Sequence, residues 1–198
     1  MAKAKNAVQG ADLDNDELVA LARLDVERGD LEKALVKLKQ ALTVDNPPAE
    51  ALAMTARLYA QLHLFPRAAE LFRRCLELNP QAETERFQYG MVQFDSGEVD
   101  KALDSWEEVL RTDPIHPPSL FYKSLGLVQL GRAGEARNVL DILLKSARSD
   151  NLYFSRAKDM LQMLDSGRHN EIDRLKAGNG GSPEIKGVMP REMYKTEH

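Results

Sequence analysis

Apolar residues recur along this chain at a short and at a long spacing. Within stretches of about a dozen residues they stand three, four and seven positions apart, which places their side chains on one face of an α-helix. Over a longer range one alanine recurs every 34 residues, at Ala34, Ala68, Ala102 and Ala136. Four positions after each alanine stands a large apolar residue: Leu38, Phe72, Trp106 and Leu140. Seven positions after it stand Ala41, Cys75, Val109 and Leu143. The chain therefore contains four copies of one amphipathic unit.

Small residues and helix-ending residues repeat with the same period. Small side chains, which let two helices approach closely, stand at Ala22, Ala56, Gly90 and Ser124. Five residues before each recurring alanine comes a turn position, occupied by Gly29, His63, Gly97 and Gly131. Glycine ends a first helix there by adopting the left-handed conformation, and prolines end the second helices at Pro47, Pro80 and Pro114. Each unit is predicted to be a helical hairpin that buries its apolar face only by stacking on its neighbours.

These hairpins resemble the tetratricopeptide repeat (TPR) family, and the resemblance covers residues 15–145. The expected copies are at about 15–48, 49–82, 83–116 and 117–149. The resemblance implies an all-α solenoid of helical hairpins that coils into a right-handed superhelix. Four polar residues in the first helices depart from the apolar or aromatic residues usual in the family: Asp25, Arg86, Gln93 and Lys123.

Three segments lie outside the hairpins. Residues 1–14 are polar and are expected to form a flexible N-terminal segment. Residues 150–166 are predicted to form a capping helix with Asp150 as its N-cap, because a solenoid needs a helix that covers its last repeat. Its apolar face comprises Tyr153, Ala157, Met160, Leu161 and Leu164. Residues 167–198 are rich in glycine and have no helical period, so we expect a flexible tail.

The composition limits the classes of function. The 198 residues carry 27 Lys and Arg against 31 Asp and Glu, a formal net charge of −4. This balance argues against nucleic-acid binding, which needs a basic surplus to displace counterions from phosphates. No apolar stretch approaches the roughly 18 residues of a membrane span, and no apolar run of a secretory signal follows the first lysines. We therefore expect a cytoplasmic protein that does not insert directly into a membrane.

The residues that commonly carry catalysis are dispersed. The four histidines, His63, His116, His169 and His198, have no carboxylate, cysteine or second histidine at metal-ligand spacing. The single cysteine, Cys75, excludes an intramolecular disulfide and occupies a small-residue position within a hairpin, where a buried and inert thiol is expected. The sequence thus predicts no enzyme, no cofactor and no metal site.

The resemblance implies that first-helix positions 2, 5, 9, 12 and 13 of each repeat line a concave groove that binds a ligand. In the N-terminal half these positions include Arg23 and Arg57, so that half is polar. In the C-terminal half they include an apolar set: Phe87, Met91, Phe94, Phe121, Leu125 and Val128. An exposed apolar patch marks an interaction site, and this one would receive an apolar helix or extended peptide of a partner protein.

Three other interpretations of the apolar set are open. Phe94 could turn inward in place of the aromatic missing at Gln93, which would leave a smaller patch. The last helix could lean across the groove. The tail could bind to its own groove through residues 188–190 or 193–194.

Two functions are compatible with such a groove. The first is a non-catalytic adaptor or scaffold that holds an apolar segment of a partner. The alternative is a dedicated chaperone of an apolar secretion client, because the length and acidity are similar to those of type III class II chaperones. The carboxylate clamp of heat-shock co-chaperones is not expected, since Val19, Arg23 and Met54 stand where that clamp needs lysine and asparagine.

Overall fold

The computed structural model describes residues 13–167, and within this range the chain is entirely α-helices and connecting turns. It divides into two compact units, residues 1–55 and 56–198, of which the described parts are treated separately below. The helices are α1 (Asn15–Arg28), α2 (Leu31–Ala41), α3 (Ala49–Gln61), α4 (Phe65–Leu78), α5 (Glu83–Asp95), α6 (Val99–Thr112), α7 (Pro117–Gln129), α8 (Ala133–Ser146) and α9 (Leu152–Asp165). The boundary between the units falls within α3.

The helices come in pairs with the period of the sequence. First helices begin at Asn15, Ala49, Glu83 and Pro117, which are 34 residues apart. The residue at each predicted turn position has a positive φ: 81° at Gly29, 56° at His63, 85° at Gly97 and 75° at Gly131. Glycine adopts this left-handed conformation without the steric cost of a Cβ atom, which explains three of the four choices. The prediction of an all-α helical-repeat solenoid is confirmed.

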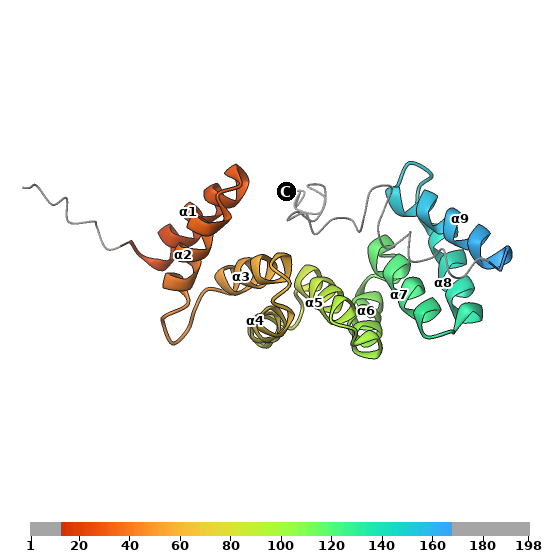
Figure 1. Ribbon diagram of the computed structural model, residues 1–198, viewed down its shortest axis with the longest axis horizontal. Coiled ribbons are helices and arrows are strands. Elements are labelled where there is room, and N and C mark those ends of the chain that lie inside the picture. The colour runs from red at the N-terminus through yellow and green to blue at the C-terminus, as the bar shows by residue number, and fades with distance from the viewer. Residues whose placement is uncertain (1–12, 168–198) are drawn as a thin grey trace, which may run out of the picture. The chain divides into compact units, whose positions relative to one another are not determined.

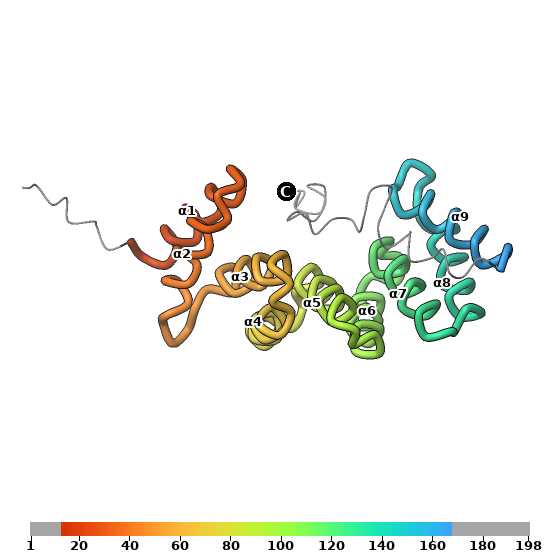
Figure 2. Tube along the Cα trace, in the orientation of Figure 1, coloured from red at the N-terminus to blue at the C-terminus, as the bar shows by residue number. Residues whose placement is uncertain are grey.

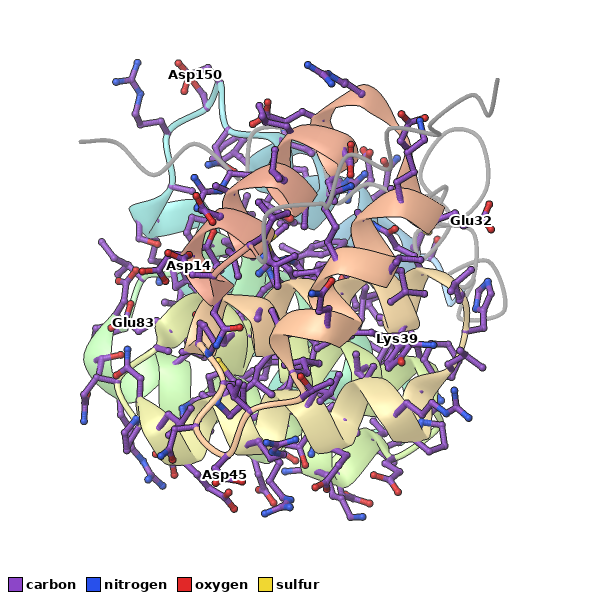
Figure 3. The ribbon with its side chains drawn as sticks, turned by 90° about the vertical axis from the view of Figure 1, so that its left-hand side faces the viewer. Asp14, Glu32, Lys39, Asp45, Glu83 and Asp150 are labelled. Atoms are coloured by element: carbon purple, nitrogen blue, oxygen red, sulfur yellow. The ribbon has the colours of Figure 1, made fainter. Side chains whose placement is uncertain are left out.

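The first unit is built on the α1–α2 hairpin. Asp14 caps α1, because its Oδ1 accepts a hydrogen bond from the Glu17 backbone N–H at 2.8 Å while Glu17 Oε2 accepts one from the Asp14 N–H at 2.9 Å. The apolar faces of the two helices meet at buried Leu18, Ala22, Ala34 and Leu38. Charged side chains such as Glu32 and Lys39 are exposed and project away from the ribbon (Figure 3).

In the second unit each helix packs on its neighbour in sequence from α4 to α9, and α9 also packs on α7 (Figure 1). The chain reverses sharply between α5 and α6 and again between α7 and α8, as the trace shows (Figure 2). The core centres on Trp106, which is fully buried and whose Nε1 donates a hydrogen bond to the Phe87 carbonyl at 3.3 Å. Ala68, Ala102 and Ala136 are fully buried, as expected for positions where only a small side chain fits between paired helices.

The start of the last helix differs from the prediction by one residue. Asn151, not Asp150, is the N-cap of α9, and its side chain accepts a hydrogen bond from the Tyr153 N–H at 2.8 Å. Asp150 is exposed and forms an ion pair with Arg148 at 3.0 Å instead. Both residues are good N-caps, and the backbone position of Asn151, which has an extended conformation, decides between them.

The polar residues that depart from the family pattern have specific partners. Asp25 is buried and pairs with Lys37 on α2. Gln93 is buried and accepts a hydrogen bond from the Ser105 hydroxyl on α6 at 2.6 Å. In both hairpins the partner stands twelve residues later, so the same two positions across the helix pair carry matched polar groups.

The other two departures also find partners. Lys123 on α7 pairs with Glu107 on α6, and Arg86 on α5 donates a hydrogen bond to the Pro80 carbonyl at 2.8 Å. Each departure therefore has a partner for its polar group, as a part-buried polar side chain requires.

Candidate protein-interaction surface

The eight residues predicted to line a groove differ in the unit to which they belong and in how deeply they are buried. Arg23 is in the first unit and the other seven are in the second. Four members of the apolar set are buried, with exposed fractions of 3% at Phe87, 8% at Phe94, 0% at Phe121 and 1% at Leu125. Met91 and Val128 are half-buried and pack on the same core. These four buried residues are therefore core rather than a solvent-exposed patch, and only Met91 and Val128 of the apolar set present part of their side chains to solvent.

Aromatic packing explains why these side chains turn inward. Phe94 packs on Trp106 with ring centroids 5.6 Å apart, so it takes the place of the aromatic that the sequence lacks at Gln93. Phe87 packs edge-to-face on His116 at 5.7 Å and against Tyr122 at 5.8 Å. Edge-to-face and tilted contacts at these distances stabilise aromatic pairs beyond the area that they bury.

Tyr122 is the centre of this aromatic cluster, although the sequence did not single it out. Its ring also lies 5.9 Å from Trp106, 5.5 Å from Phe121 and 6.3 Å from Tyr153. We define the aromatic cluster as Phe87, Phe94, Trp106, Phe121, Tyr122 and Tyr153. Burial raises the pKa of Tyr122 to about 12, and Arg156 opposes that shift while Asp95 adds to it. The hydroxyl is therefore a neutral hydrogen-bonding group at all ordinary pH values.

Helix α9 supplies the cover of Phe121. Tyr153 on α9 packs on the Phe121 ring at 5.6 Å, and buried Met160 accepts a hydrogen bond from the Ser124 hydroxyl at 3.7 Å. The guanidinium carbon of Arg156 lies 5.9 Å from the centroid of Phe121 and the same distance from that of Tyr153. The sequence predicted α9 as a capping helix and left open that it leans across the groove, but its pattern gave no sign that Arg156 lies on these rings.

Both arginines of the predicted polar half are engaged in ion pairs. Arg23 binds Glu50 through its Nη2 at 2.5 Å and through its Nε at 3.0 Å. Arg57 pairs with Glu85 at 3.7 Å. A partner that used either guanidinium would therefore have to displace a carboxylate of this protein.

The remaining candidates for chemistry have structural roles. Cys75 is buried, and burial raises the pKa of its thiol to about 11, with Glu85 adding to the shift and Arg57 opposing it. A thiol with this pKa is protonated at neutral pH and is a poor nucleophile. His116 caps α7 by accepting a hydrogen bond from the Ser119 N–H at 3.3 Å, and burial lowers its pKa below the ordinary 6.5. His169, His198 and the predicted self-binding tail lie outside the described residues.

The described residues include no group of three or more His, Cys, Asp or Glu side chains arranged to hold a metal ion. No helix in the described range combines the length and apolar character that crossing a membrane requires.

An array of stacked helical hairpins on a packed core is the architecture of a protein-interaction module. Residues 19–83 match the family model described as "Tetratricopeptide repeat". The other repeats are assigned to this fold by their period and by solved structures.

A curated relative and two solved structures are similar to the chain. It is 32% identical over 75 residues to Hsp70-Hsp90 organizing protein 1 of Glycine max, a match that covers 38% of this chain and 13% of that protein. Its fold is similar to that of YrrB, described as a TPR protein with an unusual peptide-binding site, with a TM-score of 0.66, 21% identity and coverage of 73% and 74%. It is also similar to MamA, with a TM-score of 0.63, 21% identity and coverage of 68% and 79%.

Proposed function

We propose that this protein is a non-catalytic adaptor or scaffold that binds a segment of a partner protein along the first helices of its repeats. In the second unit, the binding face comprises the half-exposed side chains of α5 and α7 that pack on the buried core, Met91 and Val128. The fold supports this proposal because hairpin repeats present their first helices as a continuous row. YrrB, whose fold is similar, is described as a TPR protein with an unusual peptide-binding site, which supports a peptide as the class of ligand.

The observation that carries the proposal is the half-exposure of Met91 and Val128 over a rigid core. Both side chains pack on the aromatic cluster and its neighbours, yet each keeps part of its surface in water. Methionine adapts its shape to irregular apolar partners, and a fixed aromatic floor lowers the entropy cost of ordering the site. The partner segment is therefore expected to contribute one or two apolar side chains, a smaller apolar contact than the sequence alone predicts.

We do not propose for this chain the role that the name of the curated relative describes. In the first unit, Val19 and Met54 are buried apolar side chains at the positions where a carboxylate clamp would need polar groups, and Arg23 is paired with Glu50. We therefore do not propose binding of the acidic ends of heat-shock chaperones. The dedicated-chaperone alternative has no supporting observation in the described residues and is not proposed.

The test is an affinity capture from a lysate of the native organism with three baits. The wild type is compared with a Met91→Glu, Val128→Glu double variant, which places charges on the half-exposed residues without opening the core. Ile142→Glu on α8 is the control, because Ile142 is an exposed apolar residue of a second helix. We expect a partner that the wild type and the control retain and the double variant loses. Equal capture by all three folded baits would exclude the proposed face.

A further inference from the structure

Arg156 occupies an unusual position for a charged side chain. Its guanidinium carbon lies 5.9 Å from the ring centroids of Phe121 and Tyr153, and its positive charge opposes the rise in the pKa of Tyr122. The residue is half-buried, so part of it remains accessible to solvent. Contacts with two aromatic rings restrict its orientation, which an exposed arginine would have to lose entropy to adopt.

The ion pairs of residues 13–167 do not include Arg156. Other arginines of the same unit, such as Arg57, Arg132 and Arg137, each have a carboxylate within 4 Å, whereas Arg156 lies over two aromatic rings. A guanidinium carries five N–H donors in a planar fork. These donors match the geometry of a carboxylate, which accepts two parallel hydrogen bonds.

We propose that Arg156 is the anion-binding anchor of the interaction surface and takes a carboxylate of the bound partner segment. The carboxylate comes from an acidic side chain or from the C-terminus of that segment, and the chemistry at Arg156 is the same for both. The identity of the ligand as a protein segment rests on the proposed function, whereas the carboxylate site itself does not. Besides filling the core, two rings of the aromatic cluster thus position the Arg156 guanidinium.

The charged groups nearby set the strength of this site. Asp95, an exposed residue at the end of α5, acts on the same Tyr122 hydroxyl as Arg156 and opposes the approach of a second negative charge. Lys158 and Asp159 are exposed neighbours on α9 whose opposite charges largely offset each other. Asp95→Asn is therefore expected to strengthen carboxylate binding, while Arg156→Gln should weaken it.

The site is tested first by NMR of the arginine Nε–Hε groups in the full-length protein. The probes are N-acetyl-glutamic acid amide, which carries a side-chain carboxylate, N-acetyl-alanine, which carries a terminal one, and neutral N-acetyl-glutamine amide. The Arg156 signal is assigned by its disappearance in Arg156→Lys, and exposed Arg111 on α6 is the internal control. We expect one or both acidic probes to shift the Arg156 signal, with a larger shift in Asp95→Asn and little change at Arg111. No shift at Arg156, equal shifts at both arginines, or an equal shift with the neutral probe would overturn the proposal.

A second experiment connects the site to a partner segment. A displayed peptide library is selected on the wild type, and the selected peptide is synthesised in its original form, with glutamine in place of glutamate, and with an amidated C-terminus. We expect one of the two changes, and Arg156→Gln in the protein, to weaken binding about tenfold or more, the effect of losing a hydrogen bond to a charged group. Selected peptides whose affinity ignores both changes and Arg156→Gln would contradict the anchor. A failed selection beside a positive NMR result would instead contradict the proposed function alone.

Discussion

Gly90 on α5 determines, as a single residue, how closely α5 and α6 approach. A Cβ atom built there would lie 2.5 Å from Nε1 and 2.8 Å from Cδ1 of Trp106, distances that real Cβ atoms do not show. The Trp106 ring is fully buried and bonded to the Phe87 carbonyl, so it has no room to move. The small-residue pattern that the sequence showed at this position is thus explained by one contact.

Gly90→Ala is expected to destabilise the protein by about 1–3 kcal/mol, because overpacking against Trp106 outweighs the better helix propensity of alanine. Gly134→Ala on α8 is the matched control, since a Cβ there meets nothing within 4 Å. The control should be neutral or more stable by up to about 1 kcal/mol. Urea unfolding monitored by circular dichroism measures both. Equal stability of the two variants would show that Trp106 yields to the added methyl group.

His116 gives a second prediction at the residue scale. Burial lowers its pKa from 6.5, so the unfolded chain binds a proton more readily than the folded one. Stability from this group is fully present above about pH 6.5 and decreases as the pH falls through the lower pKa of the folded state. His116→Asn keeps an N-cap acceptor for Ser119 but does not titrate. The free energy of unfolding of the wild type, relative to this variant, should decrease from pH 7 to pH 5; parallel curves would contradict the assignment.

At the scale of the element, two facing positions of each hairpin, one on each helix, carry residues of matching polarity. Asp25 and Lys37 pair in the first hairpin, and Gln93 and Ser105 in the third. The equivalent positions are both apolar in the second hairpin, Tyr59 and Leu71, and in the fourth, Leu127 and Val139. Asp25 and Gln93, which depart from the family pattern at this position, therefore each have a polar partner on the second helix of their hairpin. The pattern within one helix could not reveal that partner.

Lys37→Leu alone is expected to cost about 1–3 kcal/mol, because it leaves the buried Asp25 carboxylate without its partner. The Asp25→Leu, Lys37→Leu double variant should recover most of this loss, since an apolar pair of similar size replaces a buried ion pair well. A complete double-mutant cycle by chemical denaturation measures the coupling. Additive effects of the two single changes would show that the pair contributes no mutual stabilisation.

For the molecule as a whole, the sequence predicted the helix pairs and turns that recur in each repeat and missed the contacts that occur at one place only. The period of Ala34, Ala68, Ala102 and Ala136 was sufficient to predict the helix pairs and their turns, because similar units pack in similar ways. It left open whether the last helix covers Phe121, because α9 belongs to no complete hairpin and the repeat period does not define its contact with α7. For the same reason Arg156 and Tyr122 carried no signal: their significance arises only where α7 and α9 meet.

The role of α9 leads to a prediction on the whole second unit. A chain that ends at Ser146 lacks Tyr153, Met160 and Arg156 and therefore exposes Phe121 and Tyr122, two of the largest apolar surfaces of the core. Full burial of each such side chain is worth roughly 1.5–3 kcal/mol, so the truncated chain should lose about 3 kcal/mol or more and melt at a lower temperature. Its loss of helicity should exceed the 14 residues of α9, because α7 and α8 lose their cover.

A chain that ends at Gly167 keeps every described contact of α9 and should melt like the full-length protein. Circular dichroism and calorimetry on the three chains compare these outcomes, and an unchanged melting temperature in the chain that ends at Ser146 would show that α7 holds Phe121 without α9, which would also remove the support for the position of Arg156.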